Sequence, residues 1–390
     1  MSYRKFLADQ LFTGHSLHTN AGLVLISDPS GMILDIVPEQ DAGDDILRLD
    51  GLLSPGFINA HCHLELSHMR GQIPEHTGLV DFVFNVVTQR HLPEAEIRDA
   101  IDRAENEMRE NGIVGVGDIC NTALTLAQKQ KENLAYYNFV EVSGWAPAVA
   151  AERYAKAAEQ CALFRNESSG RAVLVPHAPY SVSDPLWTLL QQGFGRQTIS
   201  MHNQETAFED ELFLSGTGGF SRMYEMMKLD TSFFQPTGKS SLASSISRFA
   251  DAGKLLLVHN TFTGAQDLDL LAASGLEAYL CLCINANLYI ENAVPPVELF
   301  RKYGNTMVVG TDSLASNHSL SILDELKSIA QHFPQVPMSE MLQWATLNGA
   351  KALQMDDVAG SFDKGKRPGI ILLQQAPGKI ETVTTVQRIL

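Results

Sequence analysis

The sequence predicts an α/β protein with a (β/α)8 barrel and a small β domain built from both chain ends. Between about residues 56 and 358, eight apolar, strand-like runs are mostly separated by amphipathic helical stretches. Strand–helix alternation on this scale is typical of parallel strands, and eight units favour a closed barrel. The chain ends instead contain short apolar runs separated by turn signals, as in AGLVLISDPSGMILDIVPE. We therefore expect a barrel over residues 56–358 and a terminal domain made of residues 1–55 and 359–390.

Size and charge exclude several classes of protein. The chain has 390 residues, 45% of them hydrophobic, which is enough for a large core. Its net charge is 29 − 45 = −16, which disfavours binding to nucleic acid or to an anionic membrane. The first residues lack the apolar centre of a signal peptide, and no apolar run is long enough to span a bilayer. Five cysteines are too few for a disulfide scaffold, so a cytoplasmic location is expected.

The predicted elements of the barrel follow in chain order. The stretch EAEIRDAIDRAENEMRENG places Ile97, Ile101, Ala104 and Met108 on one helical face and ends at an Asn-Gly pair. In the seventh strand two cysteines alternate, and packed free thiols are favoured there over a redox pair. The predicted strands contain the sequences FINAHCH, IVGVGDI, AYYNFVEV, AVLVPHAP, TISMHNQE, KLLLVHN, EAYLCLC and TMVVGTD.

The first strand ends in two histidines at alternate positions, His61 and His63. Alternate residues of a strand point to the same face, so both imidazoles aim at one point while Cys62 faces away. Such a pair suits a Zn-type ion. The HxH motif alone leaves open a second interpretation, in which two polar residues at a strand end form unrelated hydrogen bonds.

Four more strands end in polar residues: His177, His202, His259 and Asp312. Because the carboxyl ends of barrel strands share one rim, we expect these side chains to converge on a catalytic metal site with room for water. Glu205 follows His202 by three residues and suits proton transfer beside metal-activated water. Its alternative role is that of a carboxylate favoured by a helix N-terminus.

In their order, the motifs PGFINAHCHLE, HAPY, HNQE, CINANL and GTDSLASN resemble those of the amidohydrolase superfamily. The resemblance covers nearly the whole chain and implies a (β/α)8 TIM barrel with a small β-sandwich built from both chain ends. The fourth strand has no lysine to bridge two metal ions. The chain therefore looks like the mononuclear branch, which includes nucleoside and purine deaminases and triazine chlorohydrolases.

The resemblance also implies roles for the site residues. One divalent metal ion is expected, with zinc favoured and iron or manganese compatible with the same ligands. Asp312 would take a proton from the attacking water, Glu205 would deliver it to the substrate nitrogen, and His259 would hold the water in line. His177 resembles a histidine that contacts the substrate in nucleoside deaminases. The residues that resemble the metal ligands are His61, His63, His202 and Asp312.

The stretches HLELSHMRG and GTDSLASNHSLSILDE resemble aminodeoxyfutalosine deaminases of a menaquinone pathway. This implies hydrolytic deamination of an adenine nucleoside that carries a benzoate. Arg70 or Arg90 would bind the carboxylate, although either fits a solvated surface residue. Glu65 would bind a ribose or an amine, or else form a salt bridge in its loop. Residues 206–247 predict a lid or an extra helical hairpin packed on the barrel.

Two other functions stay open. The same metal ligands serve a chlorohydrolase or a triazine- or guanine-type amidohydrolase, which differ only in the pocket. An inactive binding subunit would be expected to have lost Glu205 or Asp312, and both are present. The expected partner is a small aromatic or nucleoside substrate. The oligomeric state is open, although a homodimer is common for this architecture.

Overall fold

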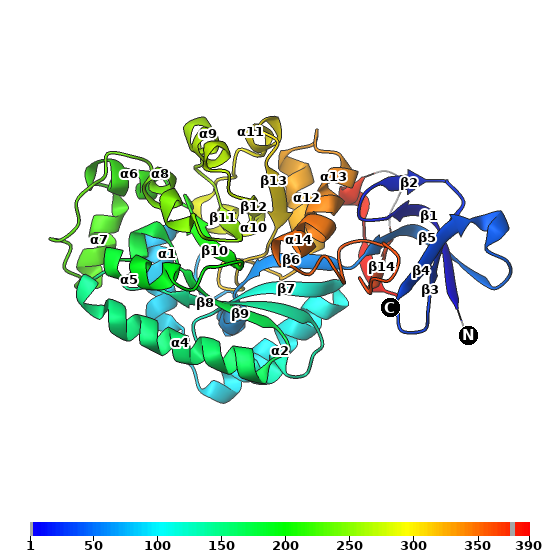
Figure 1. The fold of residues 1–390 in the computed structure, drawn as a ribbon, viewed down its shortest axis with the longest axis horizontal. Helices are drawn as coiled ribbons and strands as arrows, with labels where there is room; N and C mark the ends of the chain where they lie inside the picture. Colours follow the sequence, from blue (N-terminus) through cyan, green and yellow to red (C-terminus); the bar gives the residue numbers. More distant parts are fainter. Residues whose placement is uncertain (1–2, 375–378) are drawn as a thin grey trace.

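The computed structural model describes residues 3–374 and 379–390. A small sheet lies at the right of Figure 1, next to both chain ends, and a larger body of strands and helices lies at the left. Strands from both ends of the chain meet in the small sheet, because β14 (Ile370–Gln374) pairs antiparallel with β5 (Ile46–Pro55). The chain therefore leaves this sheet once, builds the larger body, and returns.

The terminal strands form one sheet of seven strands, in the order β15-β14-β5-β1-β3-β4 with β2 paired to β1. The expected β-sandwich is not confirmed, because the described terminal strands form one continuous sheet. Register shifts in the β1–β5 and β3–β4 pairs interrupt the ladder, and such bulges bend a sheet so that it curls over its own core. The remaining strands are β1 (Arg4–Phe12), β2 (Leu17–Thr19), β3 (Leu23–Ser27), β4 (Ile33–Pro38) and β15 (Thr385–Arg388).

Each of the eight apolar runs of the larger body is a strand, and all their pairings are parallel. Because helices cover these strands, most of their residues are buried whichever face they point to. The strands are β6 (Phe57–Cys62), β7 (Ile113–Cys120), β8 (Ala135–Val142), β9 (Arg171–Pro176), β10 (Thr198–Asn203), β11 (Lys254–His259), β12 (Ala278–Leu282) and β13 (Thr306–Val309).

These strands form two four-stranded sheets, β6-β7-β8-β9 and β10-β11-β12-β13, and do not form the expected closed ladder. At one junction the backbone N–H of His202 donates to the carbonyl of His177 over 2.9 Å. At the other, Cys62 and Asp312 form a single parallel bridge. One feature limits strand pairing at each junction. Pro176, at the end of β9, has no N–H to donate at the first junction, and β13 has only four residues at the second.

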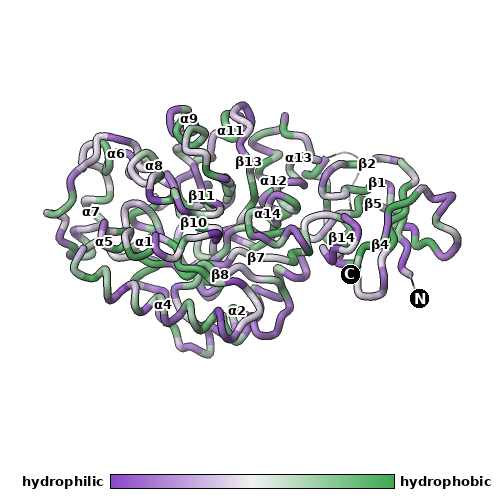
Figure 2. The backbone as a smooth tube through the Cα atoms, in the orientation of Figure 1, coloured by the Kyte–Doolittle hydropathy of each residue, from purple (hydrophilic) through white to green (hydrophobic). Residues whose placement is uncertain are grey.

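Helices follow most strands and cover the outside of the two sheets (Figure 1). The predicted helix is present as α2, and its four apolar residues are buried. Figure 2 shows hydrophobic colour along β8 and mixed colour along α2 and α4, as expected for helices with one apolar face. Outside residues 206–247, the α-helices of eight or more residues are α1 (Leu79–Gln89), α2 (Glu94–Glu110), α4 (Ala150–Glu167), α5 (Asp184–Gln191), α9 (Ala265–Ser274), α10 (Ile284–Glu291) and α12 (Ile322–His332).

Residues 206–247 contain three helices that pack beside the strand ends, which agrees with the extra helical segment expected there. The other α-helices of the described residues are α3 (Leu126–Lys129), α6 (Phe208–Ser215), α7 (Gly219–Met226), α8 (Ser241–Ser245), α11 (Val297–Lys302), α13 (Met338–Gln343) and α14 (Gly349–Ala352). Within the described ranges, no helix combines the length and the apolar content needed to cross a membrane. All five cysteines are free and buried.

Candidate active site

Four side chains from three strand ends converge on one point. His61 belongs to β6, His63 follows it directly, His202 belongs to β10, and Asp312 lies three residues beyond β13. The Nε2 atom of His63 lies 3.2 Å from Nε2 of His61, 3.3 Å from Nε2 of His202 and 3.3 Å from Oδ1 of Asp312. Oδ1 of Asp312 is also 3.4 Å from Nε2 of His61.

These spacings fit a metal ion. Four ligand atoms at about 2.0–2.1 Å around a tetrahedral ion lie about 3.3 Å from one another. Buried imidazole nitrogens that face one another at 3.2–3.3 Å suit a cation placed between them. His61, His202, His259 and Asp312 also offer ligand atoms within 4.8 Å of one another. The distances to the neighbouring ligand atoms are shortest for His63, which favours His63 as a ligand and His259 in a neighbouring position.

Hydrogen bonds orient the two histidines of β10 and β11. Nδ1 of His202 donates to the carbonyl of His177 over 2.9 Å, which leaves its Nε2 lone pair for a metal ion. Nδ1 of His259 donates to Oδ1 of Asn287 over 2.7 Å, so its Nε2 faces the site as an acceptor. Both rings are therefore held in the tautomer that the proposed roles need.

Burial sets the charges of the site. It lowers the pKa of His63 to about 3 and that of His259 to about 4, and it holds the pKa of His202 well below the usual range. Burial alone raises the pKa of Asp312. The hydrogen bond from His61 and the attraction of neighbouring imidazoles outweigh this effect and hold that pKa well below its usual value. Neutral imidazoles beside one ionised carboxylate are the protonation states of a ligand set.

Glu205 lies beside this cluster with a different protonation state. Its Oε1 is 3.6 Å from Nε2 of His259, and its side chain is buried. Burial, followed by the charges of Asp312 and Glu209, raises the pKa of Glu205 well above its usual value. The backbone N–H of Glu205 donates to Oε1 of Glu209 over 2.9 Å, which fixes the turn that carries it. Two carboxyl groups at one site therefore differ in protonation, as acid–base catalysis requires.

These groups form the floor of a cavity of about 440 Å³, a size typical of small-molecule sites. Beyond the floor the walls are mainly apolar and come from α1, from the segment after β8 and from α7. Met223, Tyr224 and Met227 belong to the 206–247 segment and line this cavity, so part of that segment covers the site. Trp145 stacks on Tyr224 with ring centroids 4.8 Å apart and closes one side.

A family model described as the amidohydrolase family matches residues 52–388. The chain belongs to the amidohydrolase family. The resemblance seen in the motifs is thereby confirmed, and the protein is a hydrolase of carbon–nitrogen bonds from a metal-dependent family.

Several relatives of this amidohydrolase are named as deaminases. It is 27% identical over 381 residues to a 5-methylthioadenosine/S-adenosylhomocysteine deaminase of Saccharophagus degradans, covering 89% of this chain and 79% of the relative. It is 26% identical over 326 residues to an adenosine deaminase of Helicobacter pylori, covering 82% and 78%. Its fold matches that of H. pylori aminofutalosine deaminase in complex with methylthio-coformycin, with a TM-score of 0.85, 22% identity, and coverage of 99% and 100%.

The predicted substrate-binding residues of the amidohydrolase lie in different places. His177 and Arg90 line the cavity. Arg70 instead forms an exposed ion pair with Glu107 and is not among the residues that line it. Oε2 of Glu65 accepts hydrogen bonds from the backbone and hydroxyl of Thr122, at 2.9 and 2.8 Å. Glu65 therefore holds the neighbouring loop in the described structure.

Sequence reasoning missed several residues of the cavity wall. Glu141 lies near the end of β8, and Trp145 and Arg153 follow it in the chain. The only sequence signal was a carboxylate near the end of the third predicted strand, in AYYNFVEV.

The backbone at the site is unusual. His259, Asn260, Asp312 and Gln204 have φ values of 72°, 55°, 57° and 43°, in the left-handed region that non-glycine residues seldom adopt. Such conformations persist only where the surrounding structure enforces them, and they cluster at functional sites. They turn the side chains at the ends of β10, β11 and β13 into the cavity.

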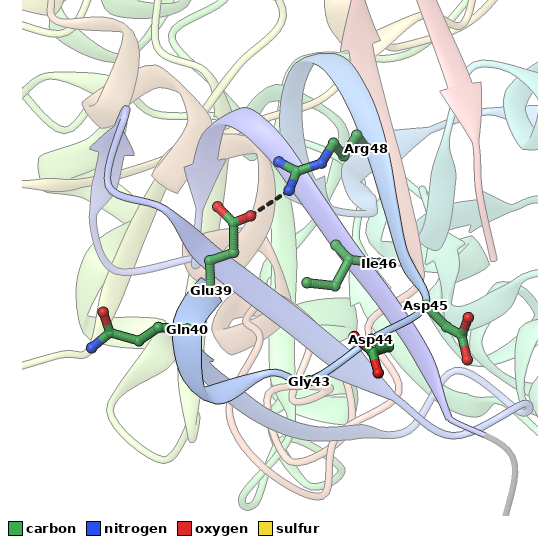
Figure 3. A pocket seen from close by; sticks show the side chains of 7 residues that line it. All are labelled: Glu39, Gln40, Gly43, Asp44, Asp45, Ile46 and Arg48. Carbon is green, nitrogen blue, oxygen red and sulfur yellow. Dashed lines mark hydrogen bonds and ion pairs between the residues drawn. The ribbon is translucent and has the colours of Figure 1, made fainter.

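A second hollow, of about 620 Å³, lies on the terminal sheet around residues 39–48 (Figure 3). Its polar side chains are exposed, and Glu39 pairs with Arg48 across it. None of the predicted catalytic residues lines it, so the cavity at the strand ends is the candidate active site.

Proposed function

We propose that this amidohydrolase is a metal-dependent deaminase of an adenine nucleoside, with 6-amino-6-deoxyfutalosine or another adenosine derivative as substrate. The observation that carries the proposal is the convergence of His61, His63, His202 and Asp312 beside a protonated Glu205 at the floor of one cavity. Three imidazoles and a carboxylate at tetrahedral spacing favour zinc. The names of the relatives support the nucleoside class.

The reaction adds water to the ring carbon that bears the amino group and releases ammonia. A divalent ion held by the four ligands would lower the pKa of water and polarise it toward attack. The Asp312 carboxylate accepts a proton from the attacking water. Protonated Glu205 donates its proton to the ring nitrogen. Asp312 then passes the proton it took from water to the amino group, which leaves as ammonia, and the hydroxyl proton of the adduct returns to Glu205. Nε2 of His259 accepts a hydrogen bond from the water and keeps it in line with the carbon.

The cavity beyond the floor supports a substrate larger than a free base. Apolar side chains of α1 and α7 face it, and two guanidinium groups, those of Arg90 and Arg153, also line it. An apolar substituent with an anionic end would therefore find partners there. This supports an adenosine derivative with a long 5′ substituent, such as the benzoate-bearing substrate.

An ammonia-release screen tests the reaction. The metal-loaded protein is assayed with adenosine, methylthioadenosine, S-adenosylhomocysteine, aminodeoxyfutalosine, guanine, and a halogenated and an alkylamino triazine. We expect ammonia from at least one adenine nucleoside, and Glu205→Gln to lower kcat/KM by about 10²–10⁴-fold while metal content stays unchanged. Hydrolysis of a triazine without deamination of any nucleoside would favour the chlorohydrolase function. Equal inactivity of wild type and variant on every compound would favour a binding subunit.

The role of Arg90 is tested separately with Arg70 as its matched control. Arg90→Met should lower kcat/KM for aminodeoxyfutalosine by about 10-fold or more, because a charge-assisted hydrogen bond is lost, and should change methylthioadenosine less. Arg70→Met removes an equal charge from the exposed surface and should leave both rates unchanged. Equal effects of Arg90→Met on both substrates would contradict the assignment.

A further inference from the structure

Three polar atoms around the cavity lack hydrogen-bond partners among the described residues: Oε2 of Glu141, Nε1 of Trp145 and the hydroxyl of Tyr180. The Glu141 side chain is only 7% exposed. Buried polar atoms are nearly always paired in folded proteins, so unpaired ones that line a cavity indicate a bound ligand. Glu141 is the strongest of the three: Asn121 hydrogen-bonds its carboxyl group, but Oε2 is left without a donor, and an unpaired carboxylate oxygen is costly to bury.

A second metal ion does not explain Glu141. Glu141, His177 and His202 offer ligand atoms within 4.8 Å of one another. However, the His202 atom that faces Glu141 is Nδ1, at 3.6 Å, and this atom already donates to the carbonyl of His177. A protonated nitrogen has no lone pair for a cation, and its other nitrogen belongs to the first metal cluster. Oε2 of Glu141 is therefore an acceptor for a hydrogen-bond donor of a ligand.

Hydroxyl groups fit this acceptor best. Asn121 and Ser143 line the cavity next to Glu141, and apolar residues of α1 and α7 lie farther out. Glu141, Asn121 and Ser143 thus form a polar band of the cavity lining, distinct from its apolar part. In a nucleoside whose base reacts at the floor, the group attached to the base is a sugar, and it would reach this band first. A carboxylate accepts two hydrogen bonds at once, which matches two vicinal hydroxyls.

We propose that Glu141 is a specificity-determining residue that accepts hydrogen bonds from the 2′- and 3′-hydroxyls of a ribose. This inference rests on the proposed function and narrows its substrate class to ribonucleosides, against deoxynucleosides and free bases. The unpaired Nε1 of Trp145 would donate to an oxygen of the same ligand.

The test compares adenosine with 2′,3′-dideoxyadenosine on metal-loaded wild type, Glu141→Gln and Glu141→Leu. Hydrogen bonds to a charged group predict that wild type prefers adenosine by about 10-fold or more in kcat/KM. The leucine variant should bring this ratio to about one, mainly through KM, while metal content stays unchanged. The glutamine variant, which keeps the shape of the side chain, should fall in between. A ratio that survives in folded Glu141→Leu protein overturns the inference.

Glu105→Gln is the matched control, because Glu105 is a fully buried carboxylate on α2 that accepts hydrogen bonds from Tyr136 and Gln128 and does not line the cavity. Glu105→Gln should keep the wild-type ratio of kcat/KM between adenosine and 2′,3′-dideoxyadenosine. Calorimetric binding of both nucleosides in the Glu205→Gln background separates the two proposals. If wild type deaminates no nucleoside, the proposed function fails. The inference is then judged by binding alone, and it is overturned if the dideoxynucleoside binds Glu141-containing protein as tightly as adenosine does.

Discussion

A buried ion pair behind the first two barrel strands predicts a large loss of stability when one partner is removed. Nζ of Lys129 lies 2.5 Å from Oδ2 of Asp118, and the two side chains are 1% and 0% exposed. The other oxygen of Asp118 accepts the backbone N–H of Leu64, which follows His63, over 2.8 Å. Lys129 also donates to Asn138 over 2.7 Å. The pair therefore supports the segment that carries two predicted metal ligands.

Lys129→Met keeps most of the side-chain length and apolar surface but removes the charge. Asp118 is then left buried with the N–H of Leu64 and a weak contact from Cys120. Removing one partner of a buried pair costs about 3–5 kcal/mol, because the other charge stays uncompensated. Adding Asp118→Asn removes that charge as well, so the double variant should recover about 2 kcal/mol or more relative to Lys129→Met.

Urea unfolding of wild type, both single variants and the double variant measures these differences. Lys131→Met serves as the control, because Lys131 pairs with Asp102 over 2.7 Å with side chains 52% and 44% exposed. Such a surface pair is worth at most about 1 kcal/mol. The reasoning is refuted if Lys129→Met costs no more than this control, or if the double variant is no more stable than Lys129→Met.

Three further variants have defined outcomes. Burial raises the pKa of Glu325 to about 8, so the stability that its protonated form contributes is lost as pH rises from about 4.5 to 8. Glu325→Gln should therefore flatten the fall of Tm over that pH range. Calorimetry that shows an unchanged slope of Tm against pH would contradict this. Gly310→Ala would place a Cβ 2.8 Å from the Cβ of His61, so chelator competition should show weaker metal binding. The free energy of unfolding should fall by about 1–3 kcal/mol, which lowers Tm. An unchanged metal affinity would contradict this expectation. Trp145→Ala removes the stacking on Tyr224 and should raise KM about 3- to 10-fold in steady-state assays, with less effect on kcat. An equally large fall of kcat would contradict the placement of Trp145 in the cavity wall.

The convergence of these side chains at the cavity floor was predictable from sequence because each polar residue follows a recognisable apolar run. His61, His202 and His259 end strands whose apolar sequences define them, and parallel strands of one sheet bring such ends to a common edge. The motif order added the family, which the family match confirms.

The cavity wall and the sheet arrangement were not predictable in the same way. Glu141 and Trp145 face the cavity because of how the segments after β8 and around α7 pack, which no local pattern records. Asp118 sits inside an apolar strand, and its partner Lys129 lies on a short helix, so nothing in the spacing pairs them. Pro176 and the short β13 leave two half-sheets in place of one closed ladder, although the sequence contains eight strands.

The central claim is that three imidazoles and one carboxylate bind a single divalent ion at the strand ends. Anomalous diffraction from crystals of the metal-loaded protein, collected at the absorption edge of the metal, tests it most directly. We expect one strong peak about 2.0–2.2 Å from Nε2 of His61, His63 and His202 and from a carboxylate oxygen of Asp312. A peak beside Glu141 and His177 instead, or no peak in protein that is active, would contradict the account.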